Sequence, residues 1–251
     1  RISGAAFKEA KRLVEAGDIG MINFIESTND RFNAIGAWQY SIPSDASLKT
    51  IDWETFLGDA PKRAFDPVRF FRWRNYRDYG TGVAGDLFIH LITGVHFVTG
   101  SLGPNRIFSS GQLSYWKDGR DVPDVMVATM EYPAMGKLDS FQMVLRVNFA
   151  NAGSIKNVTR IVGNEGEITF GGNSLTLTKR KLAAAPGYGN GESFGTFSNA
   201  QQQEYLAAYD AKYPAETRTP EPVKEVLFDA PKEDDAHKNH FANFFEGILN
   251  N

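Results

Sequence analysis

A long part of this chain consists of strand-like segments that follow one another without helices between them. Residues 107–178 are rich in β-branched or alternating residues, and turn signals such as Lys117-Asp118-Gly119 and Gly171-Gly172-Asn173 interrupt them. Parallel strands need long crossover connections, so strands in direct succession favour an antiparallel sheet. The sequence therefore predicts an α+β fold: an open, mostly antiparallel β-sheet with helices packed on one face. The expected strands are Ile107–Trp116, Val125–Tyr132, Ser140–Phe149, Thr159–Val162, Glu167–Phe170 and Ser174–Thr178.

Helical spacing flanks this stretch on both sides. Between Gly82 and Gly100 the apolar residues Val83, Leu87, Leu91 and Val95 recur at the period of a helix. Residues 31–50 have no such period and are expected to form a loop with Trp38 and Tyr40 exposed. Further expected elements are a helix over 3–16 closed by Gly17, a strand over 21–28, a short helix over 50–58, a helix over 198–213 capped by Ser198, and a last helix from Asp234 or Asp235.

Composition excludes several classes of function. The formal net charge is −3 and no block of lysines or arginines stands out, so the basic surface that nucleic acid requires is absent. No apolar run approaches the roughly 20 residues of a membrane span. The chain has no cysteine, which rules out disulfides, zinc–thiolate sites and a cysteine nucleophile. The chain begins and ends inside helical patterns, so we expect it to be part of a longer protein.

The segment GTGVAGDLFIH, residues 80–90, contains the spacing G-x-G-x-x-G. A dinucleotide fingerprint needs a hydrophobic strand before its glycines and an acidic residue about 20 positions later. Here RWRNYRDY precedes the glycines, and residues 101–117 contain no acid. We therefore reject that interpretation and expect Gly82 and Gly85 to let a substrate or cofactor approach the start of a helix closely.

Asp86 and His90 stand four residues apart on the same predicted helix and should project from one face. Histidine titrates near neutral pH, and a neighbouring carboxylate can orient its ring and stabilise the imidazolium. The pair is thus a candidate for acid–base catalysis, and the alternative is a capping aspartate beside a structural histidine. His96 lies six residues further on and is expected to pack or to face solvent.

Other side chains near this segment are weaker candidates. Arg72, Arg74, Arg77 and Tyr79 precede the glycine turn and could bind a polyhydroxylated or acidic substrate, or form a structural ion-pair network. Trp38 and Tyr40 could stack on a sugar, although a place in the core or at a subunit interface is the simpler interpretation. His237 and His240 are three apart, but no further ligands accompany them, so no metal site is predicted. The glycine-rich segment over 186–197 is a lid or a plain connection.

The residues as a whole resemble the C-terminal part of the glucose–fructose oxidoreductase, inositol dehydrogenase and MocA family (Gfo/Idh/MocA). Three segments carry the resemblance, in this order and spacing. AKRLVEAGDIGMINFIE resembles the helix, turn and first strand by which these proteins leave their cofactor domain. DYGTGVAGDLFIH resembles the family's glycine-rich helix start followed by D-x-x-x-H. TRIVGNEGEITF resembles a later hairpin of the same sheet.

This resemblance implies roles for single residues. His90 matches the catalytic histidine, the general base toward a substrate hydroxyl, and Asp86 matches its carboxylate partner. Two positions depart from the pattern: Phe88 replaces a glycine and Thr93 an aspartate found in many relatives, which leaves the substrate class open. The family's catalytic lysine, in a Glu-Lys-Pro motif of the cofactor domain, has no counterpart in this sequence.

The resemblance also implies an arrangement of domains. Residues 1–18 would be a linking helix docked on an N-terminal Rossmann domain outside this sequence, which would bind NAD or NADP. Residues 19–251 would be the substrate-binding and oligomerisation domain. Homo-oligomers would form through the sheet, and the substrate would be a small carbohydrate-like molecule.

Three functions follow as hypotheses. The first is an NAD(P)-dependent oxidoreductase that acts on a hydroxyl of a sugar, sugar acid or polyol. The second is an NAD-dependent glycosidase that uses the same constellation. The third is a non-catalytic carbohydrate-binding or oligomerisation module.

This chain by itself is expected to fold but to bind NAD or NADP no tighter than about millimolar, and to show no dehydrogenase activity. The reason is that neither a glycine turn after a strand nor an acid for the adenosine ribose is encoded. Calorimetric titration with both cofactors measures this. Micromolar binding that vanishes in Gly82→Val would mean that residues 80–85 are a dinucleotide fingerprint after all.

Overall fold

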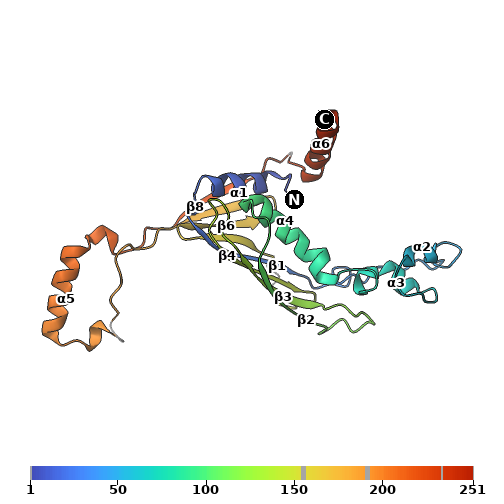
Figure 1. Cartoon of the computed structure of the whole chain (residues 1–251), viewed down its shortest axis with the longest axis horizontal. Coiled ribbons are helices and arrows are strands. Elements are labelled where there is room, and N and C mark those ends of the chain that lie inside the picture. The colour runs from blue at the N-terminus through green and yellow to red at the C-terminus, as the bar shows by residue number, and fades with distance from the viewer. Residues whose placement is uncertain (1, 154–156, 190–192, 233, 251) are drawn as a thin grey trace.

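The computed structural model covers the chain and describes residues 2–153, 157–189, 193–232 and 234–250. Its centre is one sheet with the strand order β2-β3-β4-β1-β5-β6-β7-β8 (Figure 1). Neighbouring strands are antiparallel except β1 and β4, which are parallel. The predicted α+β fold with an open, mostly antiparallel sheet is confirmed. The strands are β1 (Ile22–Asp30), β2 (Arg106–Gln112), β3 (Val125–Tyr132), β4 (Phe141–Asn148), β5 (Thr159–Gly163), β6 (Gly166–Gly171), β7 (Ser174–Lys179) and β8 (Lys224–Asp229).

The helices that pack on the sheet lie on one of its faces (Figure 1). α1 and α4 contact each other there, and both contribute to the apolar core that the sheet closes from below. In β4 the side chains of Phe141, Met143 and Leu145 reach this core, and the residues between them face the other side. The helical elements are α1 (Ala5–Glu15), α2 (Trp53–Leu57), α3 (Pro67–Phe71), η1 (Trp73–Asn75), η2 (Ala84–Phe88), α4 (Ile89–Thr99), η3 (Phe194–Thr196), α5 (Asn199–Lys212), η4 (Ala215–Thr217) and α6 (Ala236–Leu249).

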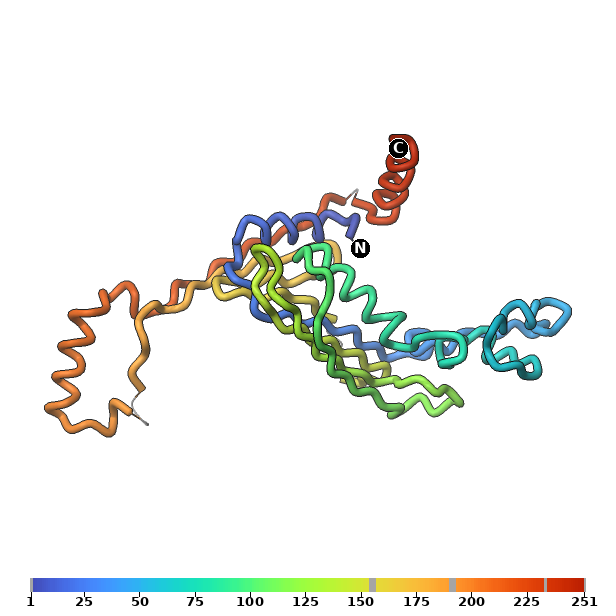
Figure 2. The backbone as a smooth tube through the Cα atoms, in the orientation of Figure 1, coloured from blue at the N-terminus to red at the C-terminus, as the bar shows by residue number. Residues whose placement is uncertain are grey.

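Between β7 and β8 the chain leaves the sheet as an arm that carries α5 (Figure 2). Two backbone hydrogen bonds join the outgoing and returning passes, Ala185 N to Thr217 O at 3.0 Å and Glu221 N to Lys181 O at 2.9 Å. The predicted cap Ser198 is present and forms a capping box that starts α5. Within the glycine-rich segment of this arm, residues 190–192 lie outside the described residues. The aromatic rings of the arm pack against one another, mostly edge to face or tilted: Tyr188, Phe194, Phe197, Tyr205, Tyr209 and Tyr213.

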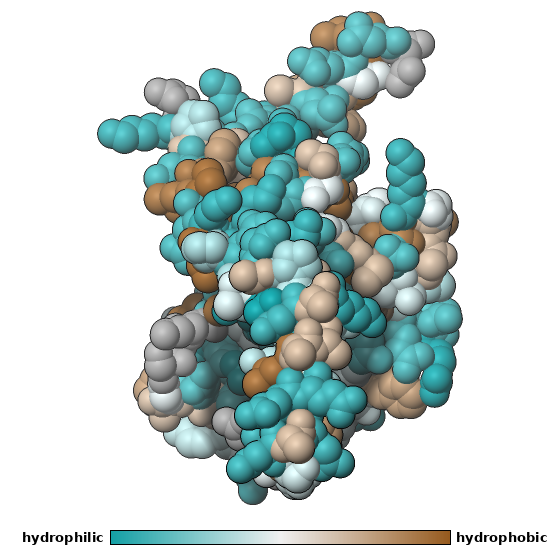
Figure 3. Space-filling model, turned by 90° about the vertical axis from the view of Figure 1, so that its left-hand side faces the viewer, coloured by the Kyte–Doolittle hydropathy of each residue, from teal (hydrophilic) through white to brown (hydrophobic). Residues whose placement is uncertain are grey.

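The last helix, α6, stands clear of the sheet at the top of the molecule (Figures 1 and 3). Its N-cap is Asp235, as predicted. The base of α6 is tied to the start of α1, because Ala5 N donates to Asp234 Oδ2 at 2.9 Å and Asn239 Nδ2 donates to Ser3 O at 3.4 Å. The rest of α6 is solvent-exposed, including its apolar side chains Phe241, Phe244, Phe245, Ile248 and Leu249. In the part of the chain that the structure describes, no helix is long and apolar enough to cross a membrane.

The expectation for Trp38 needs correction, and two elements were not predicted. The predicted loop over 31–50 is present, but Trp38 is buried at 1% exposure and only Tyr40 is partly accessible. The reason is that Trp38 adopts a left-handed conformation, φ 64°, which turns its ring inward onto the edge of Phe149. A sugar-stacking role for Trp38 is therefore wrong. Strand β8 and helix α3 were not predicted from the sequence, although Asp66 caps α3 and Pro67 starts it.

One buried carboxylate holds the connection from β2 to β3. Asp124 is fully buried, and its two oxygens accept hydrogen bonds from the backbone N–H groups of Ser114, Tyr115 and Trp116 at 2.7, 2.7 and 2.8 Å. Burial alone would raise the pKa of Asp124, but the N–H donors favour the ionised form and bring the pKa below its usual value. The buried carboxylate of Asp124 thus fixes the loop, because three backbone N–H groups take the place of the water molecules that would solvate it at the surface.

Asp124→Asn is expected to lower the free energy of unfolding by about 2–4 kcal/mol at neutral pH, because an amide can accept at only one of the two oxygen positions. Since the pKa is lower in the folded chain, the carboxylate contributes fully above its unfolded value near 4 and loses this contribution as the pH falls through the folded value. Denaturant titrations at about pH 7 and about pH 2.5 should therefore show a gap between wild type and variant that narrows in acid. The exposed Asp139→Asn is the control and should change little. An equal gap at both pH values would contradict this account.

Candidate functional site

The helix that carries Asp86 and His90 begins in η2, a π-helical segment, and continues as α4. Its inner face is buried in the core through Leu87, Phe88 and Leu91. Its outer face is open: His90 is exposed, and the side chain of Asp86 retains 29% of its accessible surface. π-helical turns are rare in proteins, and those that occur are often found at functional sites. The predicted acid–base residues thus lie on the solvent side of a helix whose other side is fixed by packing.

Asp86 and His90 do not contact each other in this structure. Hydrogen bonds in a π-helix span one residue more than in an α-helix, so side chains four apart are rotated away from each other. Asp86 pairs instead with Arg74, whose Nε lies 3.0 Å from Asp86 Oδ1. Among the described residues, none forms a hydrogen bond or an ion pair with His90. The imidazole is free to meet another molecule, and its pairing with Asp86 stays a prediction.

The glycines around the helix start have packing reasons of their own. Gly82 has φ 59° and is buried, and a Cβ there would lie 3.1 Å from the side chain of Val122. A Cβ on Gly85 would lie 1.7 Å from Thr81 Oγ1, although the backbone of Gly85 is exposed. The described residues before them form α3 and η1 rather than a strand. The strand-turn-helix geometry of a dinucleotide fingerprint is therefore not present at residues 80–85.

The other predicted substrate residues are already engaged or enclosed. Arg77 binds Asp121, with its backbone N 2.8 Å from Oδ1 and its Nε 3.1 Å from the carbonyl oxygen. The Tyr79 hydroxyl is buried and has no hydrogen-bond partner among the described residues. The Tyr79 ring packs on Phe56, with ring centres 5.0 Å apart. The structure thus brings only Arg74 into contact with the predicted catalytic pair.

Sequence reasoning missed the ion-pair cluster around Asp78. Arg63 Nη2 lies 2.6 Å from Asp78 Oδ2, and Arg69 Nη1 lies 3.3 Å from the same oxygen. The guanidinium of Arg69 also stacks over the Tyr76 ring at 4.2 Å. The composition of residues 63–78 could have predicted this cluster. Arginines in a folded chain need acidic partners, and Asp66 and Asp78 are the acids within this segment. This cluster fastens the region of α2 and α3 to the turn that precedes the helix.

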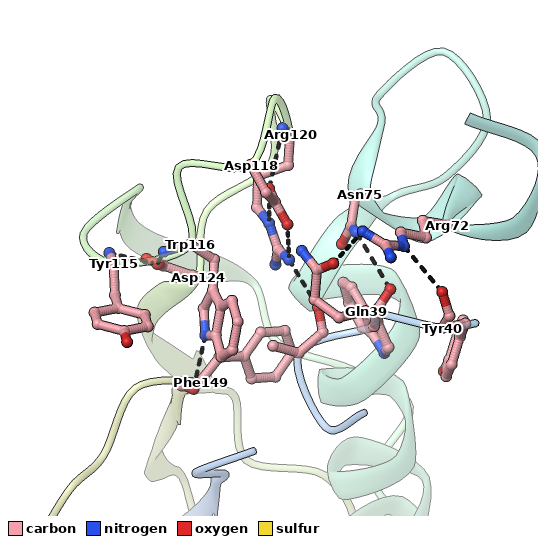
Figure 4. Close-up of polar contacts among 12 residues, drawn as sticks. Gln39, Tyr40, Arg72, Asn75, Tyr115, Trp116, Asp118, Arg120, Asp124 and Phe149 are labelled. Atoms are coloured by element: carbon pink, nitrogen blue, oxygen red, sulfur yellow. Dashed lines mark hydrogen bonds and ion pairs between the residues drawn. The ribbon is translucent and has the colours of Figure 1, made fainter. Parts of the chain in front are cut away.

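A second polar cluster fixes the loop that contains Trp38 (Figure 4). Arg120 is buried and pairs with Asp118 at 2.7 Å, while its Nη2 donates to the Ala37 carbonyl at 2.8 Å. Asn75 Nδ2 donates to the Trp38 carbonyl at 3.4 Å, and Arg72 binds the next residues, donating to the Tyr40 carbonyl at 3.0 Å and to the Gln39 side chain. Arg72 is therefore structural. The donors hold the strained Trp38 backbone next to the helix start.

His96 lies further along α4 and joins that helix to the sheet. Its Nε2 is 2.9 Å from the Tyr132 hydroxyl, and the two rings meet edge to face. Burial lowers the pKa of His96 and raises the pKa of Tyr132 to about 12. A histidine kept neutral in this way packs against the core, as the sequence analysis expected.

A cavity of about 520 Å³ lies at a different place, between the starts of α1 and α6 and the end of β1. Phe7, Leu91 and Phe170 form its apolar part, and Asp234 and His237 lie at its edge. Neither Asp86 nor His90 lines it. No group of three or more histidine, aspartate or glutamate residues able to hold a metal ion occurs in the described part of the chain.

Solved structures of similar architecture have low sequence identity to this chain. An inositol dehydrogenase homolog from Azotobacter vinelandii, complexed with NADH and myo-inositol, is 16% identical with a TM-score of 0.47, over 74% of this chain and 39% of that one. The super-repressor mutant of Gal80p from Saccharomyces cerevisiae is 13% identical with a TM-score of 0.53, over 98% of this chain and 48% of that one. This chain thus spans less than half the length of either protein. The fold of the Gal80p match is shared across nearly the whole chain.

No curated protein sequence matches this chain. A family model, the GFO/IDH/MocA C-terminal domain, matches residues 55–169. The matched segment contains the helix with Asp86 and His90 and the strands β2 to β5. Over residues 55–169, this chain is thus similar to the GFO/IDH/MocA C-terminal domain.

Proposed function

We propose that this chain is the substrate-binding and oligomerisation part of an NAD(P)-dependent oxidoreductase that acts on a hydroxyl of a sugar, sugar acid or polyol. The observation that carries the proposal is the helix through η2 and α4. In a segment that matches the family domain, it presents an unpaired, exposed His90 and the carboxylate of Asp86 on its outer face. An imidazole on a rigid, accessible element is suited to take a proton from a hydroxyl group.

Among the described residues, the outer face of this helix is where the nicotinamide end of a cofactor would fit. Gly85 is exposed there and offers backbone at close range, whereas Gly82 is packed against Val122 and shapes the turn. When bound, the cofactor supplies the hydride acceptor. His90 would accept the hydroxyl proton, and Asp86 would balance the charge that His90 gains. The adenosine end would be held by a domain that precedes residues 1–18, and residues 19–251 would hold the substrate.

Two similar solved structures contain polyhydroxylated ligands of the proposed substrate class. The Azotobacter vinelandii protein is complexed with myo-inositol, and another similar structure is a levoglucosan dehydrogenase complexed with NADH and levoglucosan, 16% identical with a TM-score of 0.44 over 70% of this chain and 40% of that one. Both ligands carry several hydroxyl groups. The Gal80p structure is that of a super-repressor mutant, so a protein with a regulatory name also has this fold. The fold alone therefore does not establish the chemistry, which must be tested at the site itself.

In the full-length protein, His90→Ala is expected to lower turnover by about 10² to 10⁴, the usual contribution of a positioned general base, with little change in cofactor affinity. The measurement is reduction of NAD or NADP with a panel of free sugars, sugar acids and polyols. His237→Ala is the matched control, because the His237 side chain is 97% exposed and lies on α6. If turnover survives in His90→Ala, the base is elsewhere. Release of nitrophenol from nitrophenyl glycosides would instead indicate the glycosidase, and inactivity of the wild type in both assays would favour the non-catalytic module.

The open face of the sheet supports the expected homo-oligomer. It combines the partly exposed apolar side chains of Val127, Val144 and Val162 with ion pairs such as Arg160 to Glu26 at 2.6 Å. No helix covers this face in Figure 1, so a second copy of the chain would bury it.

Light scattering of the full-length protein at micromolar concentration is expected to give a dimer or a larger species. Val127→Arg should shift it toward monomer, because it places an unpaired charge in the buried contact. Leu48→Arg, at an exposed apolar side chain of the 31–50 loop, is the control and should leave the mass unchanged. A wild type that is strictly monomeric would contradict association through the sheet.

A further inference from the structure

The contact between Arg74 and Asp86 links two different elements of the site. Asp86 belongs to the helix, whereas Arg74 lies in η1, twelve residues earlier in the chain. The guanidinium of Arg74 stacks over the Trp73 ring, 4.3 Å from its centre. Gly80 also lies close to that ring, because an added Cβ on Gly80 would lie 3.2 Å from Trp73. Arg74 is therefore held by an aromatic plane that is itself seated on the glycine turn.

This arrangement fixes one oxygen of Asp86 and leaves the imidazole of His90 free. Arg74 Nε donates to Asp86 Oδ1 at 3.0 Å, and the two side chains retain 31% and 29% of their accessible surface. A surface ion pair of two flexible side chains contributes little, because both must be ordered to form it. Here the stacking on Trp73 orders Arg74 beforehand, and the π-helical turn points Asp86 toward it. The ion pair therefore serves to orient the Asp86 carboxylate rather than to stabilise the fold.

We propose that Arg74 is a positioning residue that acts through Asp86: it orients the carboxylate beside the substrate hydroxyl, and it does not bind the substrate itself. This inference rests on the proposed function and deepens it. It also separates Arg74 from Arg77, which the sequence analysis grouped together. Arg77 donates to Asp121 and has no contact with Asp86 among the described residues.

A double-mutant cycle in the full-length enzyme tests the proposal. Arg74→Met is expected to lower kcat by about ten- to a hundredfold, the cost of a misdirected group. Asp86→Asn should lower kcat at least as much, and in the Asp86→Asn background Arg74→Met should cost almost nothing further. Arg74→Lys should recover part of kcat, because it keeps the charge without the planar fork. Arg77→Met is the matched control, and its effect, whatever its size, should be the same with and without Asp86.

Two outcomes would overturn the proposal. One is an Arg74→Met effect of equal size in both backgrounds, or one confined to KM, which would mean that Arg74 contacts the substrate directly. The other comes from a readout that needs no activity, a crystal structure of full-length Arg74→Met. The Asp86 carboxylate should leave its position there, and an unmoved carboxylate contradicts the proposal. If the wild type shows no turnover, the proposed function fails, and the crystal structure still decides whether Arg74 positions Asp86.

Discussion

The structure depends on the burial of one helix face against one sheet face. Leu87, Leu91 and Val95 on the helix meet the core that Met143 and Leu145 supply from β4. Apolar burial stabilises by roughly 25 cal/mol per Å², so a few such side chains contribute more than all the surface ion pairs nearby. Because the inner face is locked in this way, the rotation of the helix is settled, and with it the direction of every group on the outer face.

The outer face then needs only local adjustments to become a site. The π-helical turn redirects Asp86 by about one residue without disturbing the buried positions on either side of it. The ion pairs of Asp78 and the donors around Trp38 fasten the neighbouring loops to the helix start. These contacts tie the loops to the residues that directly precede the helix. Catalytic groups are held in such settings because small displacements of a reacting group are costly.

The periodic elements of this structure, most of its helices and strands, could be predicted from the sequence. The features that depend on contacts between distant residues could not. The spacing of Val83, Leu87 and Leu91 predicted the helix, and the strands from 125 to 178 were found close to their true bounds. Local chemistry also predicted the caps Ser198 and Asp235. These signals are legible because each depends on neighbours within a few residues.

Three features had no comparable signal. Burial of Trp38 depends on Arg120, whose Nη2 binds the carbonyl of Ala37 across 83 residues. The π-helical turn changes hydrogen-bond partners without changing the apolar spacing, so the pairing of Asp86 with Arg74 instead of His90 could not be read from a four-residue interval. Strand β8 is exposed along most of its length and separated from β7 by the arm, which removes both the burial pattern and the tight turn that would have marked it. In each case a non-local contact outweighed a local rule.

The bond between Asp234 and the first turn of α1 has a consequence for how the molecule opens. Gly4, at the N-cap of α1, offers no side chain, so the acceptor for Ala5 N comes from a residue 229 positions away in the chain. A helix end that depends on such a remote acceptor frays whenever that acceptor departs. The start of α1 and the base of α6 therefore open as one cooperative unit, even though they belong to opposite ends of the sequence. Any contact that stabilises α6 along its exposed apolar side therefore also stabilises the first turn of α1. The two segments have a common free energy of local unfolding.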